Sequence, residues 1–263
     1  MITPARAGRT ELADSFRHPG VAAAYVFRPP YPAEVFDLLT SLAGESGRVL
    51  DIGAGDGEIA RPLAERVEHV DAVEISPAMI AAGKQRPGGD RENLRWLAQA
   101  AETMTVTGPY SLVTAGASLH WMNGQVTLRR LAQVLSPRGV LAVVDQKYHD
   151  LPWAAELTPV IGRYSRNPAY NPGFSVTDRL SEQHLLDIRG QHHTAPMVLR
   201  QSVHDYVEQF FSTASLAREL MTDAEATRFA DEVTAVVDGY AAADGTLLVT
   251  TVASVVWGSP SGR

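Results

Sequence analysis

The chain has 263 residues, of which 45% are hydrophobic and 20% are charged, a composition typical of a globular protein with a sizeable core. Its net charge of -7 disfavours nucleic acid or an anionic membrane as the main partner and favours a small molecule or a protein. The absence of cysteine excludes disulfides, thiolate metal sites and cysteine nucleophiles. Residues 1–20 are polar, and no window resembles a membrane-spanning helix, so we expect a cytoplasmic protein.

Strands and helices are expected to alternate as far as residue 145. Short apolar runs predict strands over 48–52, 69–75, 94–97, 110–115 and 139–144. Helical spacing predicts helices over 58–66 and 126–135, and Ser76-Pro77 begins another with a capping residue and a proline. Alternation of this kind predicts an α/β fold with a mostly parallel sheet covered by helices on both faces.

Beyond residue 145 the chain is expected to be richer in helices. Two late strands, over 188–199 and 246–257, are expected to complete a seven-stranded sheet. Helical patterns over 203–211 and 223–240 lie between them and predict a helical insertion near 202–242. We expect this insertion to form a cap over a substrate.

Three alternate glycines follow the first predicted strand. In Asp51-x-Gly53-x-Gly55-x-Gly57 the backbone must pass close to another group, because only glycine accepts left-handed dihedrals without a steric cost. The carboxyl end of a parallel strand is where such sheets bind ligands. A dinucleotide fingerprint needs its third glycine one position later, so this spacing disfavours a nicotinamide-dependent oxidoreductase.

The acidic residue and three glycines resemble the first motif of the class I S-adenosylmethionine-dependent methyltransferases. Glu74 ends the second predicted strand, where that family carries an acidic residue that accepts hydrogen bonds from both ribose hydroxyls. The resemblance implies a Rossmann-like, doubly wound fold and S-adenosylmethionine as cofactor. It extends to the segment Leu135 to Leu141, which is similar to the family's turn before the fifth strand, with Arg138 replacing a glycine.

Upstream, the segment Tyr25 to Pro32 resembles an N-terminal segment of the small-molecule branch of the family, which folds over the cofactor. One departure is Ala100, where many relatives carry an aspartate that binds adenine. The resemblance therefore implies that adenine is recognised by groups near Ala101, Glu102 or Gln99. The cofactor-binding residues expected in full are Tyr25, Arg28, Tyr31, Asp51, Gly53, Ala54, Gly55, Glu74, Ile75, Ala101, Glu102, Ala115 and Ser118.

Methyl transfer needs alignment of the acceptor and, where required, removal of its proton. His120 follows the fourth strand and is the candidate catalytic base, because its ordinary pKa is near neutrality. The alternative is that His120 and its neighbour only wall the pocket. Aromatic walls suit a flat organic substrate. The expected substrate-binding residues are His120, Trp121, Tyr164, Tyr170 and Phe210, and no metal site is expected.

These observations predict three segments: a lid over 1–36, a Rossmann-like core over 37–145, and a part over 146–263 that completes the sheet and caps the acceptor. The predicted function is O-, N- or C-methylation of a small organic acceptor, in bacterial secondary metabolism, by a monomer or homodimer without nucleic-acid or membrane partners. The alternative is a protein of the same fold that binds the cofactor without methyl transfer, as a cyclase or a regulatory module.

Overall fold

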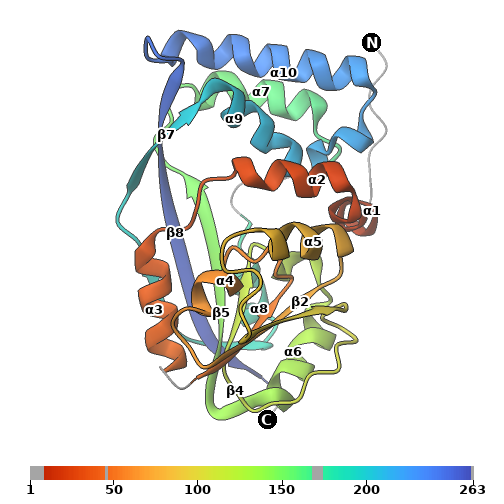
Figure 1. The fold of residues 1–263 in the computed structure, drawn as a ribbon, viewed down its shortest axis with the longest axis vertical. Coiled ribbons are helices and arrows are strands. Elements are labelled where there is room, and N and C mark those ends of the chain that lie inside the picture. The colour runs from red at the N-terminus through yellow and green to blue at the C-terminus, as the bar shows by residue number, and fades with distance from the viewer. Residues whose placement is uncertain (1–8, 45–46, 168–173, 262–263) are drawn as a thin grey trace. The chain divides into compact units, whose positions relative to one another are not determined.

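A computed structural model describes residues 9–44, 47–167 and 174–261 (Figure 1). The chain divides into two compact units. Unit 1 comprises Met1–Pro30, Lys147–Pro172 and Pro196–Val252, and unit 2 comprises Tyr31–Gln146, Gly173–Ala195 and Ala253–Arg263. Strands β5 (Leu135–Tyr148) and β8 (Thr246–Pro260) run from one unit into the other. None of the helices in the described ranges has the length and apolar character needed to cross a membrane.

Unit 2 is built around a parallel-dominated sheet. The strand order is β3-β2-β1-β4-β5-β8-β6, with β1 to β5 parallel and β6 antiparallel to β8. This arrangement confirms the predicted α/β, doubly wound fold. Its elements besides β5 and β8 are α3 (Ala33–Ala43), β1 (Arg48–Ile52), α4 (Ala60–Leu63), β2 (His69–Glu74), α5 (Pro77–Gln85), β3 (Leu94–Ala98), β4 (Tyr110–Gly116), η3 (Leu119–Trp121), α6 (Gly124–Val134), α8 (Val176–Glu182) and β6 (Leu186–His193).

Helices cover both faces of this sheet because alternate strand residues point to opposite sides. Val49 of β1 packs with Leu39 of α3 in one buried cluster, which also includes α4. The next residue, Leu50, packs in a second cluster with Leu128 of α6 and Leu180 of α8. The sheet is therefore apolar on both faces, and its polar ligand-binding groups are left to the ends of the strands.

Several predicted elements differ from the structure, among them the strand expected over 139–144, which runs from Leu135 to Tyr148. The strand expected over 188–199 is two strands, β6 and β7 (Met197–Ser202), because Pro196 between them has no backbone N–H for a ladder. The sheet therefore has eight strands rather than seven. The helix expected from residue 58 begins only at Ala60, since Gly57 is still in a left-handed conformation. The helix expected to end at Leu135 ends at Val134, and Leu135 already pairs with β4.

Unit 1 is a helical layer packed on the β7–β8 pair. Figure 1 shows α7 and α10 side by side in this unit. Its core is aromatic and centres on Trp153, Tyr206, Phe211 and Phe229. Its elements besides β7 are α1 (Arg9–Asp14), η1 (Ser15–Arg17), α2 (Pro19–Ala24), η2 (Tyr25–Phe27), α7 (Ala154–Tyr164), α9 (Val203–Glu208), η4 (Gln209–Ser212), η5 (Ala214–Leu216), η6 (Arg218–Leu220), α10 (Asp223–Val237) and η7 (Asp238–Tyr240).

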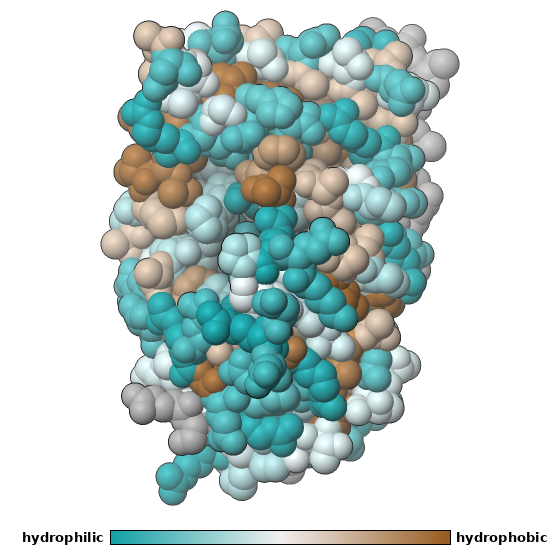
Figure 2. Space-filling view, in the orientation of Figure 1, coloured by the Kyte–Doolittle hydropathy of each residue, from teal (hydrophilic) through white to brown (hydrophobic). Residues whose placement is uncertain are grey.

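The outer face of the β7–β8 pair carries apolar side chains. Val198 is 63% exposed and Leu248 is 59% exposed, and both lie on the same face of the antiparallel pair. Figure 2 shows the hydrophobic patch over these strands. The inner face is different, because Leu247 and Val249 are fully buried in the aromatic core.

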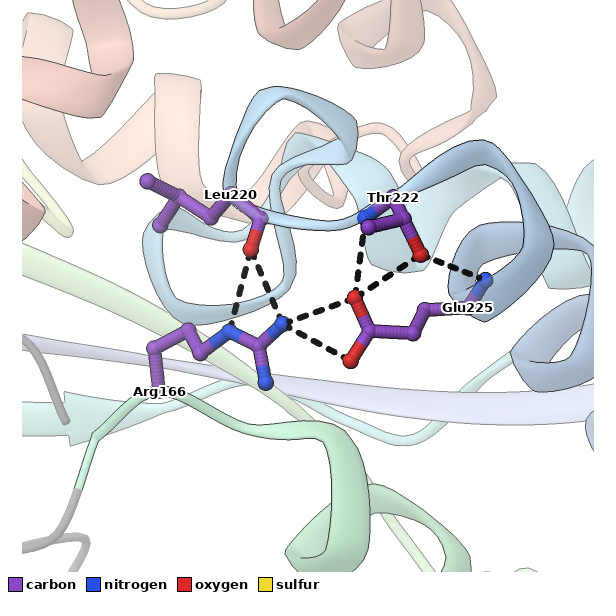
Figure 3. Close-up of polar contacts among 4 residues, drawn as sticks. All are labelled: Arg166, Leu220, Thr222 and Glu225. Carbon is purple, nitrogen blue, oxygen red and sulfur yellow. Dashed lines mark hydrogen bonds and ion pairs between the residues drawn. The ribbon is translucent and has the colours of Figure 1, made fainter. Parts of the chain in front are cut away.

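A buried arginine holds the loops between α9 and α10 against the end of α7 (Figure 3). Arg166 Nε and Nη2 both donate to the carbonyl of Leu220, at 3.0 and 2.9 Å, and Nη2 lies 3.3 Å from Glu225 Oε2. Glu225 in turn forms a capping box with Thr222 at the start of α10. One guanidinium therefore fixes the end of η6 and the first turn of α10.

We expect Arg166→Met to lower the free energy of unfolding by about 2–3 kcal/mol, because it leaves the Leu220 carbonyl without its charged donors. The matched control is Arg163→Met on α7, which removes an exposed ion pair with Glu232 and should cost less than about 1 kcal/mol. Urea unfolding of the two variants measures the difference. Equal losses would show that the Arg166 contacts contribute no more than a surface pair.

Candidate functional site

The loop after β1 has a left-handed backbone at three places. Gly53, Gly55 and Gly57 have φ values of 62°, 58° and 82°. A Cβ on Gly53 would lie 2.6 Å from the Cβ of Ser118, and one on Gly57 would lie 2.6 Å from the ring of Trp96. Both strain and clash therefore require glycine here, and the loop exposes backbone rather than side chains at the carboxyl end of the sheet.

Glu74 joins this loop to the end of β2. Its Oε2 accepts from the amide of Gly55 at 2.9 Å, and its Oε1 accepts from the amide of Ser76 at 2.8 Å. The side chain is buried, and the Ser76 hydroxyl accepts from Met79 N to begin α5. One carboxylate thus sets the position of the glycine loop and of the turn that follows β2. A carboxylate has lone pairs for about four hydrogen bonds, so amides and ligand hydroxyls can share it.

Asp51 is a second buried carboxylate, four residues before Gly55. Its Oδ1 accepts from the Thr114 hydroxyl of β4 at 2.7 Å, while Oδ2 is buried and has no hydrogen-bond partner in the described part of the chain. Burial raises the pKa of Asp51 to about 7; the charge of Glu74 adds to this, and the Thr114 bond opposes it. An unpaired buried carboxylate oxygen beside a glycine loop suits a cationic ligand group.

Charged side chains that the sequence did not predict also hold the glycine loop in place. The buried Asp56 binds Arg86 through Oδ2 at 2.6 Å, and its carbonyl accepts from Arg61 Nε at 3.0 Å. Thr114, the partner of Asp51, was also missed. The position of Asp56 inside the glycine run was the one sequence feature that pointed to it. Its partner Arg86 lies 30 positions later and follows no local pattern.

The other expected cofactor residues of unit 2 border the same end of the sheet. The Ser118 hydroxyl donates to the Ile52 carbonyl at 2.8 Å, which ties the η3 turn to the glycine loop. The Tyr31 hydroxyl lies near the end of β4, 3.2 Å from the position that a Cβ on Gly116 would take. Glu102 accepts from the amide of Asn123 at the start of α6. Ala101 and Ala115 are buried, whereas Ile75 is 39% exposed. The amide of Ala54 donates a hydrogen bond to the carbonyl of Val73.

Tyr25 and Arg28 belong to unit 1. The guanidinium of Arg28 lies 4.1 Å above the Tyr25 ring and donates to the Ser212 hydroxyl at 2.7 Å and to the Ser212 carbonyl at 3.0 Å. No carboxylate in the described part of the chain pairs with it. Arg28 is therefore a half-buried cation whose protein partners are neutral, an arrangement suited to an anionic ligand.

His120 lies on η3, directly after a strained turn in which Ala117 has a φ of 45°. Its ring packs on that of Trp121 with centroids 4.7 Å apart. Burial, together with the nearby charge of Arg179 on α8, lowers the pKa of His120 to about 4. The imidazole is therefore neutral at physiological pH and offers an acceptor nitrogen, but it is a weaker base than an exposed histidine.

The expected substrate residues fall in both units. His120 and Trp121 belong to unit 2, and Tyr164 and Phe210 belong to unit 1. Tyr164 donates to Glu232 Oε1 at 2.8 Å, and Phe210 packs edge-to-face on Tyr206 and Phe229. Tyr170 lies outside the described residues. The described residues contain no group of three or more side chains that would hold a metal ion.

We expect Glu74→Gln to destabilise the protein by about 1–3 kcal/mol, because a glutamine side chain has one oxygen and leaves one of the two amides without an acceptor. Amide hydrogen exchange should accelerate at Gly55 or Ser76. The matched control, Glu92→Gln, alters an exposed carboxylate and should leave both quantities unchanged. Unchanged exchange in Glu74→Gln would contradict the role assigned to this carboxylate.

Comparison with known proteins agrees with this geometry. Residues 49–139 match the family model of a methyltransferase domain. An uncharacterized methyltransferase of Mycobacterium tuberculosis is 30% identical over 202 residues, covering 71% of this chain and 81% of its own. Trans-aconitate 2-methyltransferase of Streptomyces avermitilis is 31% identical over 118 residues, covering 42% of this chain and 43% of its own.

The fold has relatives among solved structures. A structure described as a type II methyltransferase from Anaeromyxobacter dehalogenans superposes with a TM-score of 0.61 at 20% identity, covering 89% of this chain and 97% of that one. The glycine loop, the strand-end glutamate and these likenesses agree. The chain belongs to the class I S-adenosylmethionine-dependent methyltransferases, with S-adenosylmethionine as its cofactor.

Proposed function

We propose that this methyltransferase methylates a small organic acceptor at oxygen, nitrogen or carbon. The proposal rests on the glycine loop, whose position is fixed because both oxygens of Glu74 bind backbone amides. The same loop follows Asp51, whose buried Oδ2 is unpaired in the described part of the chain. A small acceptor is supported by the net charge of -7, which disfavours nucleic acid, and by partial similarity to a methyltransferase named for trans-aconitate.

The residues present fit the cofactor. Glycine at positions 53 and 55 gives the loop the left-handed backbone that directs its amides, and Glu74 would accept from the ribose hydroxyls. The unpaired oxygen of Asp51 would accept from the cationic α-amino group. We propose that Arg28, which has no carboxylate partner in the described part of the chain, binds the methionine carboxylate, and that Tyr25 and Tyr31 are further cofactor contacts.

The cofactor supplies an electrophilic methyl group, so the protein mainly aligns the acceptor and receives its proton. His120 is neutral because burial lowers its pKa to about 4, and its free nitrogen would accept a hydrogen bond from the acceptor. Trp121, whose ring packs at a tilt against His120, would be a further acceptor contact. We propose Tyr164, Tyr170 and Phe210 as further acceptor contacts.

We expect the affinity for S-adenosylhomocysteine to rise about tenfold between pH 6 and pH 8, because its ammonium group favours the ionised form of a carboxyl whose pKa is about 7 in the free protein. Thr114→Val removes the bond that lowers the Asp51 pKa, and should move the midpoint of this rise to higher pH. Asp51→Asn should bind more weakly and without this pH dependence. Isothermal titration at several pH values measures all three, and a pH-dependent Asp51→Asn would contradict the assignment.

A direct test of transfer uses methyl-labelled S-adenosylmethionine with a panel of small acids, phenols and amines, followed by mass spectrometry of the products. We expect label in an acceptor with the wild type and little or none with Glu74→Ala. Binding of S-adenosylhomocysteine without transfer to any acceptor would favour the alternative of a binding or regulatory module.

The role of His120 is tested with two variants and the acceptor found in that screen. We expect His120→Ala and His120→Phe both to lower turnover more than cofactor affinity, because neither keeps an acceptor nitrogen. A wall role predicts instead that His120→Phe, which keeps a ring, retains turnover. Since the pKa of His120 is about 4, the wild-type rate should show no inflection from this residue between pH 6 and pH 7.

A further inference from the structure

Unit 1 holds a group of polar side chains inside its aromatic surroundings, which we name the amide–phenol cluster: Tyr148, Gln201 and Gln209. Tyr148 ends β5, Gln201 lies on β7, and Gln209 begins η4. The Tyr148 hydroxyl donates to Gln209 Oε1 at 2.5 Å and lies 3.3 Å from Gln201 Oε1. Two carbonyl oxygens thus converge on one hydroxyl group.

The orientation of both amides is fixed by the backbone. Gln201 Nε2 donates to the carbonyl of Phe27 at 2.8 Å, and Gln209 Nε2 donates to the carbonyl of Tyr206 at 3.0 Å. Rotating either amide would place an oxygen against these carbonyls, so each Oε1 must face the hydroxyl. Neither side chain can relieve the convergence by flipping.

One proton cannot satisfy two acceptors. Burial raises the pKa of Tyr148, so its hydroxyl stays protonated and has one hydrogen to donate. The shorter contact shows that Gln209 receives it. Gln201 Oε1 is left facing an oxygen, and no other donor in the described part of the chain reaches it. Leaving a partly buried carbonyl without a donor is unfavourable, so a ligand that brings an O–H or N–H group would be favoured here.

The surroundings specify the rest of the ligand. The Phe27 ring packs edge-on against His204, and Tyr148 packs against Tyr206, which in turn contacts Phe210. Gln201 and Tyr148 are both only partly buried. An aromatic setting around one unmatched acceptor suits a flat ring that carries a hydrogen-bond donor.

We propose that the amide–phenol cluster is a binding site for an aromatic molecule that carries a hydroxyl or amine group, and that Gln201 Oε1 accepts a hydrogen bond from that group. The binding chemistry rests on unit 1 alone.

The test uses the full chain, saturated with S-adenosylhomocysteine, and two probes of nearly the same shape, phenol and anisole. Phenol donates a hydrogen bond and anisole does not. Titrations followed by saturation-transfer difference NMR should give phenol about fivefold or more tighter binding than anisole. Gln201→Met should abolish the preference. The control Gln191→Met, which alters an exposed strand glutamine, should keep it.

Tyr148→Phe provides a second variant that does not depend on the fold tolerating methionine at position 201. Removing the hydroxyl leaves Gln201 Oε1 in place and opens Gln209 Oε1, so the preference for phenol should persist or increase. The inference would be overturned if the wild type showed no preference for phenol over anisole, or if folded Gln201→Met kept that preference. Discrimination between the probes without any label transfer would instead retain the binding site and reject the proposed reaction.

Discussion

The site depends on one carboxylate that serves two backbone segments. Glu74 receives the amide of Gly55 from the loop after β1 and the amide of Ser76 from the turn after β2. The two strands are neighbours in parallel register, with Ile52 opposite Val73, so their carboxyl ends already lie together. The sheet does not fix the conformation of the glycine-rich loop after β1. Ordering that loop is costly, because glycine loses more backbone freedom on folding than any other residue. Hydrogen bonds to a charged acceptor offset that cost.

The same arrangement places two carboxylates close together, and this has an electrostatic consequence. Glu74 is bonded to amides that stabilise its charge, whereas burial raises the pKa of Asp51 to about 7 despite its bond from the Thr114 hydroxyl. The free site is therefore strained in its ionised form, and a cation relieves the strain. In the proposed function, the ammonium group of S-adenosylmethionine would supply that cation.

The parts of the molecule that the sequence predicted are those set by local spacing. The strand at 48–52, the three glycines and Glu74 lie within 27 residues, and their patterns reflect one strand-loop-helix unit followed by the next strand. The sheet was predicted with one strand too few, because the residues on both sides of Pro196 have the pattern of one continuous strand. Pro196 lacks a backbone N–H, and the structure has two strands there, β6 and β7. The helix predicted over 58–66 is only Ala60–Leu63, because periodicity registers neither the left-handed backbone at Gly57 nor the turn that follows Leu63.

The groups that the sequence did not predict are those whose partners lie far along the chain. Ser212 is 184 positions from Arg28, and Gln209 is 61 from Tyr148, so no periodicity relates them. Their chemistry depends on which oxygen faces which donor, and that is a property of packing. Unit 2 carries the groups common to a family that shares one cofactor, so local motifs identify them. The polar groups of unit 1 follow no such motif, and a ligand site can differ between relatives without changing any motif of the cofactor site. The unequal hydrogen-bond count around Tyr148 is for this reason more informative about a ligand of unit 1 than the glycine run is, because it states which kind of hydrogen bond that ligand must supply.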